Sequence, residues 1–111
     1  MKALSVRAPW AGLIASGEKT LEIRSRRCHY RGELLICQSG GGGAVAIVEV
    51  VDCRPFTEAD DAASGGVWSK YPKARTHFAW EMRVVRRVTS EPIKGKLSFY
   101  EVDPTILHPQ N

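Results

Sequence analysis

The spacing of hydrophobic and polar residues divides the chain into short segments, most of them with strand character. Residues 2–6 form a short apolar run that predicts a first strand. Residues 9–16 then have the spacing of a short helix, because three apolar side chains fall on one face: Trp10, Leu13 and Ile14. Pro9 suits the start of that helix and Gly17 suits its C-terminal cap.

A second pattern begins after Gly17, where polar and apolar residues alternate over residues 20–24. This alternation predicts a strand with Leu21 and Ile23 directed toward the core. The opposite face would then carry three polar side chains: Thr20, Glu22 and Arg24. Residues 17–24 are therefore the first place to look for a functional site.

Further stretches also have strand character, namely residues 33–38, 44–53, 77–88 and 97–102. Residues 44–53 are apolar on both faces, which predicts a central strand. A second short helix is expected at residues 57–63, where Thr57 suits the N-terminal cap. About six strands with few, short helices predict a small, mostly β barrel with helical decoration.

The length and composition of the chain indicate how many domains it can form. A chain of 111 residues that is 43% hydrophobic can bury a core without metals or disulfides. We expect one domain over residues 1–103 and a C-terminal tail over residues 104–111. Three cysteines stand at wide spacings, namely Cys28, Cys37 and Cys53. Reduced thiols fit this pattern and predict a reducing compartment, the cytoplasm. No apolar run is long enough for a membrane span, so no membrane partner is expected.

The positive charge is concentrated in two regions. The net charge is +4, but residues 1–31 alone hold seven Lys or Arg against two Glu. A second basic stretch covers residues 70–87. Basic regions of this kind favour an anionic partner such as a nucleic acid.

Cofactor motifs are missing from the sequence. The glycine-rich residues 39–43 lack the Lys-Ser/Thr of a P-loop and the glycine spacing of a dinucleotide fingerprint. No Cys or His pair has the spacing of metal ligands. We therefore expect neither a cofactor nor a metal.

Several segments together resemble the ASCH domain family, in the order in which that family has them. They are Leu-Ser-Val-Arg-Ala-Pro-Trp-Ala at 4–11, Gly-Glu-Lys-Thr-Leu-Glu-Ile-Arg-Ser at 17–25, Tyr-Arg-Gly-Glu-Leu-Leu-Ile at 30–36, Val-Glu-Val-Val-Asp-Cys at 48–53, His-Phe-Ala-Trp at 77–80 and Pro-Ile-Lys-Gly at 92–95. The resemblance implies a PUA-like fold, a small β-barrel related to RNA-binding domains. It also implies a link to RNA, and some bacterial members are small hydrolases.

The hydrolase branches of the family bear on two residues of this chain. One branch hydrolyses acetylated cytidine with a Lys, a Thr and a Glu, and another is described as a ribonuclease. By resemblance, Lys19 matches the Lys of the first branch, whereas Glu22 stands where that branch has its Thr. The branch's Glu has no firm counterpart here, and Glu58 is not assigned to it. An enzyme therefore stays open, with Lys19 and Glu22 as the candidate catalytic pair.

The candidate site residues have both a functional and a structural interpretation. Lys19 could act as a base if burial lowers its pKa, or bind a phosphate or carbonyl if it stays charged. Glu22 could accept a hydrogen bond from a base or form an ion pair with Lys19 or Arg24. Arg7 and Arg24 could bind phosphate.

Aromatic residues complete the candidate set. Trp10 could stack on a base or belong to the core, and for Trp80 the core is favoured. Trp68 and Tyr71 lie in a loop with lysines and could stack on a ligand. His77 is the best candidate among the histidines for acid–base chemistry, although a packing role is more common for a lone His.

These residues predict a protein that binds RNA or a modified nucleotide or nucleoside. The predicted cleft lies between the first helix, residues 19–24 and the loop at residues 68–75. It would contain Arg7, Trp10, Lys19, Glu22, Arg24, Trp68, Tyr71 and His77. Two alternatives stay open: a small nucleoside amidohydrolase or ribonuclease-like hydrolase that uses Lys19 and Glu22, and a protein-interaction module.

Overall fold

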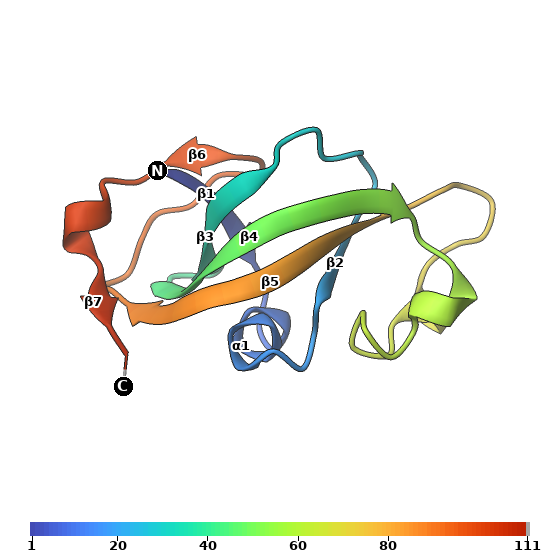
Figure 1. The fold of residues 1–111 in the computed structure, drawn as a ribbon, viewed down its shortest axis with the longest axis horizontal. Coiled ribbons are helices and arrows are strands. Elements are labelled where there is room, and N and C mark those ends of the chain that lie inside the picture. The colour runs from blue at the N-terminus through green and yellow to red at the C-terminus, as the bar shows by residue number, and fades with distance from the viewer. Residues whose placement is uncertain (111) are drawn as a thin grey trace.

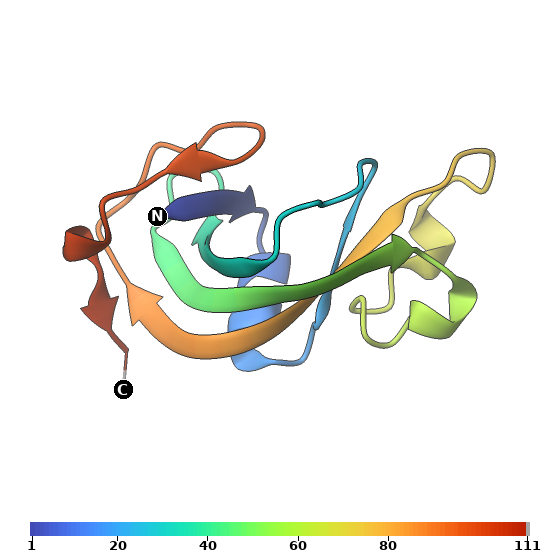
Figure 2. The ribbon, with the colours of Figure 1, turned by 45° about the horizontal axis from the view of Figure 1, so that its top comes forward.

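Two long antiparallel strands cross the molecule in the computed structural model, which describes residues 1–110 (Figure 1). They are β4 (Ala44–Pro55) and β5 (Phe78–Thr89), and each has 12 residues. The register between them shifts at Ile47/Val48 and again at Val50/Asp52. Such bulges bend strands, and Figure 2 shows the pair strongly curved. The predicted central position of the strand at residues 44–53 is confirmed.

The remaining strands extend this pair into a seven-stranded sheet. They are β1 (Lys2–Val6), β2 (Leu21–Arg24), β3 (Gly32–Gln38), β6 (Tyr100–Glu101) and β7 (His108–Pro109). The order is β2-β5-β4-β3-β1-β6, and β7 pairs with β5 outside this path. The β1–β3 pair is parallel and the others are antiparallel.

The sheet curls into a half-barrel and does not close. Within residues 1–110 no strand pairing joins β2 to β1 or β6. A side chain crosses the opening instead, because Arg24 Nη2 donates to the Ser5 carbonyl on β1 at 2.9 Å. We call this opening between β2 and β1 the seam. The predicted mostly β fold is confirmed.

The α-helix, α1 (Trp10–Ser16), packs against β3, β4 and β5. It buries Ala11, Ile14 and Ala15 in a core shared with strand residues such as Val48. Gly17 ends the helix with a φ of 83°, as the sequence predicted. Leu21 and Ile23 of β2 are also buried, in agreement with the predicted alternation.

Two predicted elements are shorter than expected. The predicted helix at residues 57–63 is a single 3-10 turn, Glu58–Asp60. Side chains there bond the backbone, since Ser64 Oγ donates to the Asp61 carbonyl, and this competes with further helical bonds. The predicted strand at residues 97–102 pairs only at Tyr100–Glu101.

The predicted tail at residues 104–111 has local structure. A 3-10 turn, Pro104–Ile106, is followed by β7, which pairs with Val88 and Thr89. Residue 111 lies outside the described part of the chain. No helix within residues 1–110 is long and apolar enough to span a membrane.

Candidate functional site

A cleft of about 640 Å³ opens at the seam. Its walls come from the end of β1, the start of α1, β2 and the loop after the second 3-10 turn, Trp68–Lys70. We call it the seam cleft. The structure brings six of the predicted site residues together in it: Arg7, Trp10, Lys19, Glu22, Arg24 and Tyr71.

The Lys19 side chain lies buried at this cleft, with only 3% of its surface exposed. Its Nζ donates to the Ser64 carbonyl at 2.6 Å and lies 3.9 Å from Glu22 Oε1. Burial lowers the pKa of Lys19, while the negative charge of Glu22 partly opposes that shift. Lys19 is therefore held in a place where a neutral amine is easier to form than in water.

Glu22 joins Lys19 to Arg24. The second oxygen of its carboxylate, Oε2, accepts a hydrogen bond from Arg24 Nε at 2.8 Å. Glu22 is only 7% exposed, so this ion pair is largely withdrawn from solvent. The ion-pair interpretation of Glu22 is therefore correct, and it leaves room for further bonds because a carboxylate can accept about four.

Arg24 has two structural bonds, one to Glu22 and one across the seam to Ser5. These bonds fix the guanidinium as a bridge between β2 and β1. Arg24 thus shapes the cleft as well as contributing positive charge to it.

The indole of Trp10 lies close to two lysines. The Nζ atoms of Lys19 and Lys70 are each 5.4 Å from its ring centroid, which is within cation–π range. Gly65 also packs close to the ring, because a Cβ added there would come within 3.1 Å of it. Tyr71 also faces this region, since burial and then the charge of Glu22 raise its pKa.

Positive charge predominates at the cleft. Arg7 and Lys70 are exposed, and within residues 1–110 neither has a carboxylate within 4 Å. Glu22 is the sole acidic residue among the described residues that line the cleft. A partly enclosed surface of this kind attracts anions.

Trp68 and His77 do not reach the seam cleft. Trp68 packs edge-on against Phe56, with ring centroids 5.2 Å apart. His77 packs against the Tyr71 ring at 4.6 Å. Both line a separate hollow, to which Tyr71 also contributes. Their spacing in the sequence could not indicate on which side of the loop they lie.

Trp80 and Glu58 also lie outside the seam cleft. Trp80 is buried, and its Nε1 donates to the Arg26 carbonyl at 2.9 Å, so it belongs to the core as favoured. Glu58 is exposed and is not among the residues that line the cleft.

Sequence reasoning missed the backbone acceptors of the site. The carbonyls of Ser64 and Ser5 bind Lys19 and Arg24, yet neither residue had been singled out. The Ser-Gly-Gly sequence at residues 64–66 was the available signal, because it marks a sharp turn. Within residues 1–110 no group of three or more potential metal ligands was found.

Comparison with known proteins agrees with this fold. The sequence model of the ASCH domain matches residues 4–92, which is most of the chain. The chain therefore belongs to the ASCH domain family, as its motifs had suggested. No curated protein matches it by sequence.

Crystal structures of an ASCH protein from Zymomonas mobilis are similar to the chain. A variant with one tyrosine replaced by phenylalanine has a TM-score of 0.68 and 14% identity, over 92% of this chain and 89% of that one. A serine-to-alanine variant has a TM-score of 0.65 and 14% identity, over 92% of this chain and 87% of that one. The unsubstituted protein has a TM-score of 0.64 and 13% identity, over 94% of this chain and 88% of that one. At such identities the likeness concerns the fold alone.

Proposed function

We propose that this ASCH domain binds RNA, or a modified nucleotide or nucleoside, in the seam cleft. The observation that carries the proposal is the buried Lys19–Glu22 pair beside the Trp10 indole, at a cleft with a positive rim. The family's PUA-like fold supports a nucleic-acid-related role.

The chemistry of the cleft suits a nucleobase. The Glu22 carboxylate can accept a hydrogen bond from an exocyclic amine, and the Lys19 ammonium can donate one to a base carbonyl. Trp10 offers an aromatic face on which a base can stack. The exposed cations Arg7 and Lys70 are suited to a phosphate.

The cost of burying the Lys19–Glu22 ion pair favours ligand recognition, not fold stability, as its role. A buried ion pair contributes little to folding, because desolvation offsets most of the attraction between its charges. The cleft volume of about 640 Å³ is also within the range of small-molecule sites.

Binding of labelled short RNA and of nucleoside monophosphates, measured by titration at several salt concentrations, tests the proposal. We expect salt-sensitive binding that Arg7→Ala/Lys70→Ala weakens about tenfold, since both cations are lost from the cleft. These residues are exposed, so the variant should fold.

A matched control removes the same charge elsewhere. Arg86 and Arg87 are adjacent exposed residues of β5 that do not line the cleft. Arg86→Ala/Arg87→Ala should leave affinity within about twofold, which is an effect of net charge alone. Equal weakening by the two double variants would contradict a site in the cleft. Failure to bind any nucleotide would favour the protein-interaction module.

A hydrolase that uses Lys19 and Glu22 is the second candidate. The lowered pKa of Lys19 favours it, because a neutral amine can serve as a base or nucleophile. The test is turnover of acetylated cytidine and of short RNA. Turnover that increases with pH and disappears in Lys19→Met would support catalysis, whereas no turnover across both substrates would exclude it.

The cysteines support a reducing compartment, and we propose the cytoplasm. Cys28, Cys37 and Cys53 are free thiols. Burial raises the pKa of Cys28 and Cys37, which disfavours the reactive thiolate.

A further inference from the structure

The seam continues past Arg24 into a second hollow of about 440 Å³. Leu4 of β1, residues 25–27 after β2, Trp80 and residues 97–99 line it. We call it the distal hollow. Arg24 and Leu97 line both the seam cleft and the distal hollow, so the two are neighbouring compartments of one groove.

The distal hollow carries unpaired positive charge. Its charged residues are Arg24, Arg26 and Arg27. Arg26 and Arg27 are exposed, and in the described part of the chain neither has a carboxylate within 4 Å. The bond from Trp80 Nε1 to the Arg26 carbonyl fixes the backbone of this segment. The Arg27 guanidinium also lies 4.6 Å from the Phe78 ring centroid. This contact uses no carboxylate, so the guanidinium N–H groups of both arginines can still bind an anion.

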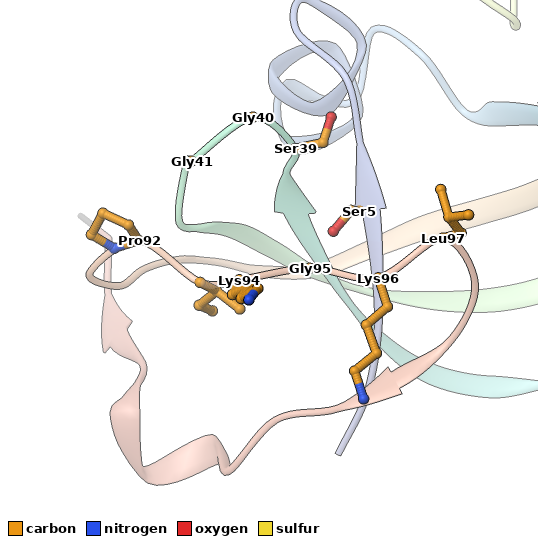
Figure 3. A pocket seen from close by; sticks show the side chains of 10 residues that line it. Ser5, Ser39, Gly40, Gly41, Pro92, Lys94, Gly95, Lys96 and Leu97 are labelled. Carbon is orange, nitrogen blue, oxygen red and sulfur yellow. The ribbon is translucent and has the colours of Figure 1, made fainter.

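An exposed leucine stands at the boundary of the two compartments. Leu97 is fully exposed, at 100%, which is unusual for a large apolar side chain. It belongs to the segment at residues 92–99, which we call the strap. Figure 3 shows the side chains of Lys96 and Leu97 leaving the strap in opposite directions.

The strap is anchored at two residues that precede Leu97. The amide of Ile93 donates to the Gly42 carbonyl at 3.1 Å. Gly95 lies so close to β1 that an added Cβ would overlap with Ser5 Oγ. These contacts bring Leu97 to the groove, and its exposed surface is available to a ligand.

We infer that the distal hollow is a second nucleotide subsite, so that the ligand is a single-stranded RNA of at least two nucleotides. One base occupies the seam cleft, and the next nucleotide lies in the distal hollow. Arg26 and Arg27 bind the phosphate of that second nucleotide, and Leu97 packs against its base. This inference rests on the proposed function of the seam cleft.

The test measures affinity against ligand length. The probes are labelled ribo-oligonucleotides of one to six nucleotides, with the four bases mixed at every position. We expect affinity to increase about tenfold from one nucleotide to two or three, because the second subsite adds a phosphate and a base contact. Unchanged affinity from one nucleotide to six would overturn the inference alone, and no binding at any length would overturn the proposed function as well.

Substitutions of exposed residues distinguish the contributions of the two compartments to binding. Arg26→Ala/Arg27→Ala should abolish the gain with length while leaving mononucleotide affinity unchanged. Leu97 lines both compartments, so Leu97→Ser should weaken binding of the longer probes more than that of a mononucleotide. The arginine variant should also reduce the salt dependence by about 0.7 per lost phosphate contact. Arg86→Ala/Arg87→Ala is the matched control, and an equal loss in it would overturn the inference. Competition by an acidic peptide as effective as that by RNA would also overturn it.

Discussion

Two charged clusters on the same sheet have nearly the same chemistry and different surroundings. In the seam cleft, Arg24 Nε lies 2.8 Å from Glu22 Oε2. On the outside of the sheet, Arg54 Nη1 lies 2.8 Å from Glu81 Oε1. The Glu22 side chain is 9% exposed, whereas that of Glu81 is 41% exposed.

The difference shows that burial, not bond length, distinguishes a candidate site from an ordinary surface ion pair. The Arg54 cluster also contacts Asp52 and Asp60 and connects the 3-10 turn to β4 and β5. Water screens it, so each of its pairs contributes little to stability. The Glu22 cluster has lost most of its water, so its charges act strongly on one another and on any ligand.

The largest expected effect on stability comes from replacing the glutamate of each cluster. Glu22→Ala leaves the buried Lys19 and the half-buried Arg24 without a carboxylate, which should cost about 3–5 kcal/mol of unfolding free energy. Glu81→Ala, on the neighbouring strand, should cost less than about 1 kcal/mol. Urea denaturation of both variants measures the contrast. Similar losses in the two would show that burial does not distinguish the clusters.

A smaller effect is expected from the turn that supplies the acceptor for Lys19. Gly65 and Gly66 have φ values of +90° and +78°, so alanine at either position costs about 1–2 kcal/mol. Only Gly65 also touches Trp10, because the space around a Cβ at Gly66 is open.

Gly65→Ala should therefore destabilise more than Gly66→Ala and should also weaken nucleotide binding through Trp10. Thermal denaturation and a binding titration of the two variants check this. If both lose the same stability and the same affinity, the contact with Trp10 has no role in the cleft.

The smallest effect concerns pH. Burial lowers the pKa of Lys19 from 10.5, so the folded protein releases this proton at a lower pH than the unfolded chain. Between these two pKa values the unfolded chain binds more protons, and the contribution of Lys19 to stability increases with pH. Lys19→Met removes this contribution.

The unfolding free energy of the wild type minus that of Lys19→Met should therefore increase as the pH rises toward 10.5. Urea denaturation at several pH values measures the difference. Lys94→Met is the control, since it removes an exposed lysine of the strap. A difference for Lys19→Met that stays constant with pH would contradict the assigned burial effect.

The sequence predicted the elements whose signals are local. The helix end at Gly17, the inward direction of Leu21 and Ile23, and the strand at residues 44–53 follow from backbone preferences and from period-two alternation. The family motifs likewise indicated the ASCH domain, which the match over residues 4–92 confirms.

The sequence was less informative where distant segments compete. It predicted strand character for residues 97–102, but the close packing of Gly95 on Ser5 holds this part of the chain as a strap. It also grouped Trp68 and His77 with the cleft, although packing against Phe56 and Tyr71 directs them to a separate hollow.

The sequence by itself thus determined a small β domain of the ASCH family and a Lys-Glu-Arg series on one short strand. Only the tertiary structure decided that Lys19 and Glu22 are buried, that Arg24 reaches Ser5, and that Arg26 and Arg27 stay unpaired at the groove. The physical reason is that burial and charge pairing depend on segments far apart in the chain. Ser64 lies 45 residues from Lys19, and no local pattern encodes their contact.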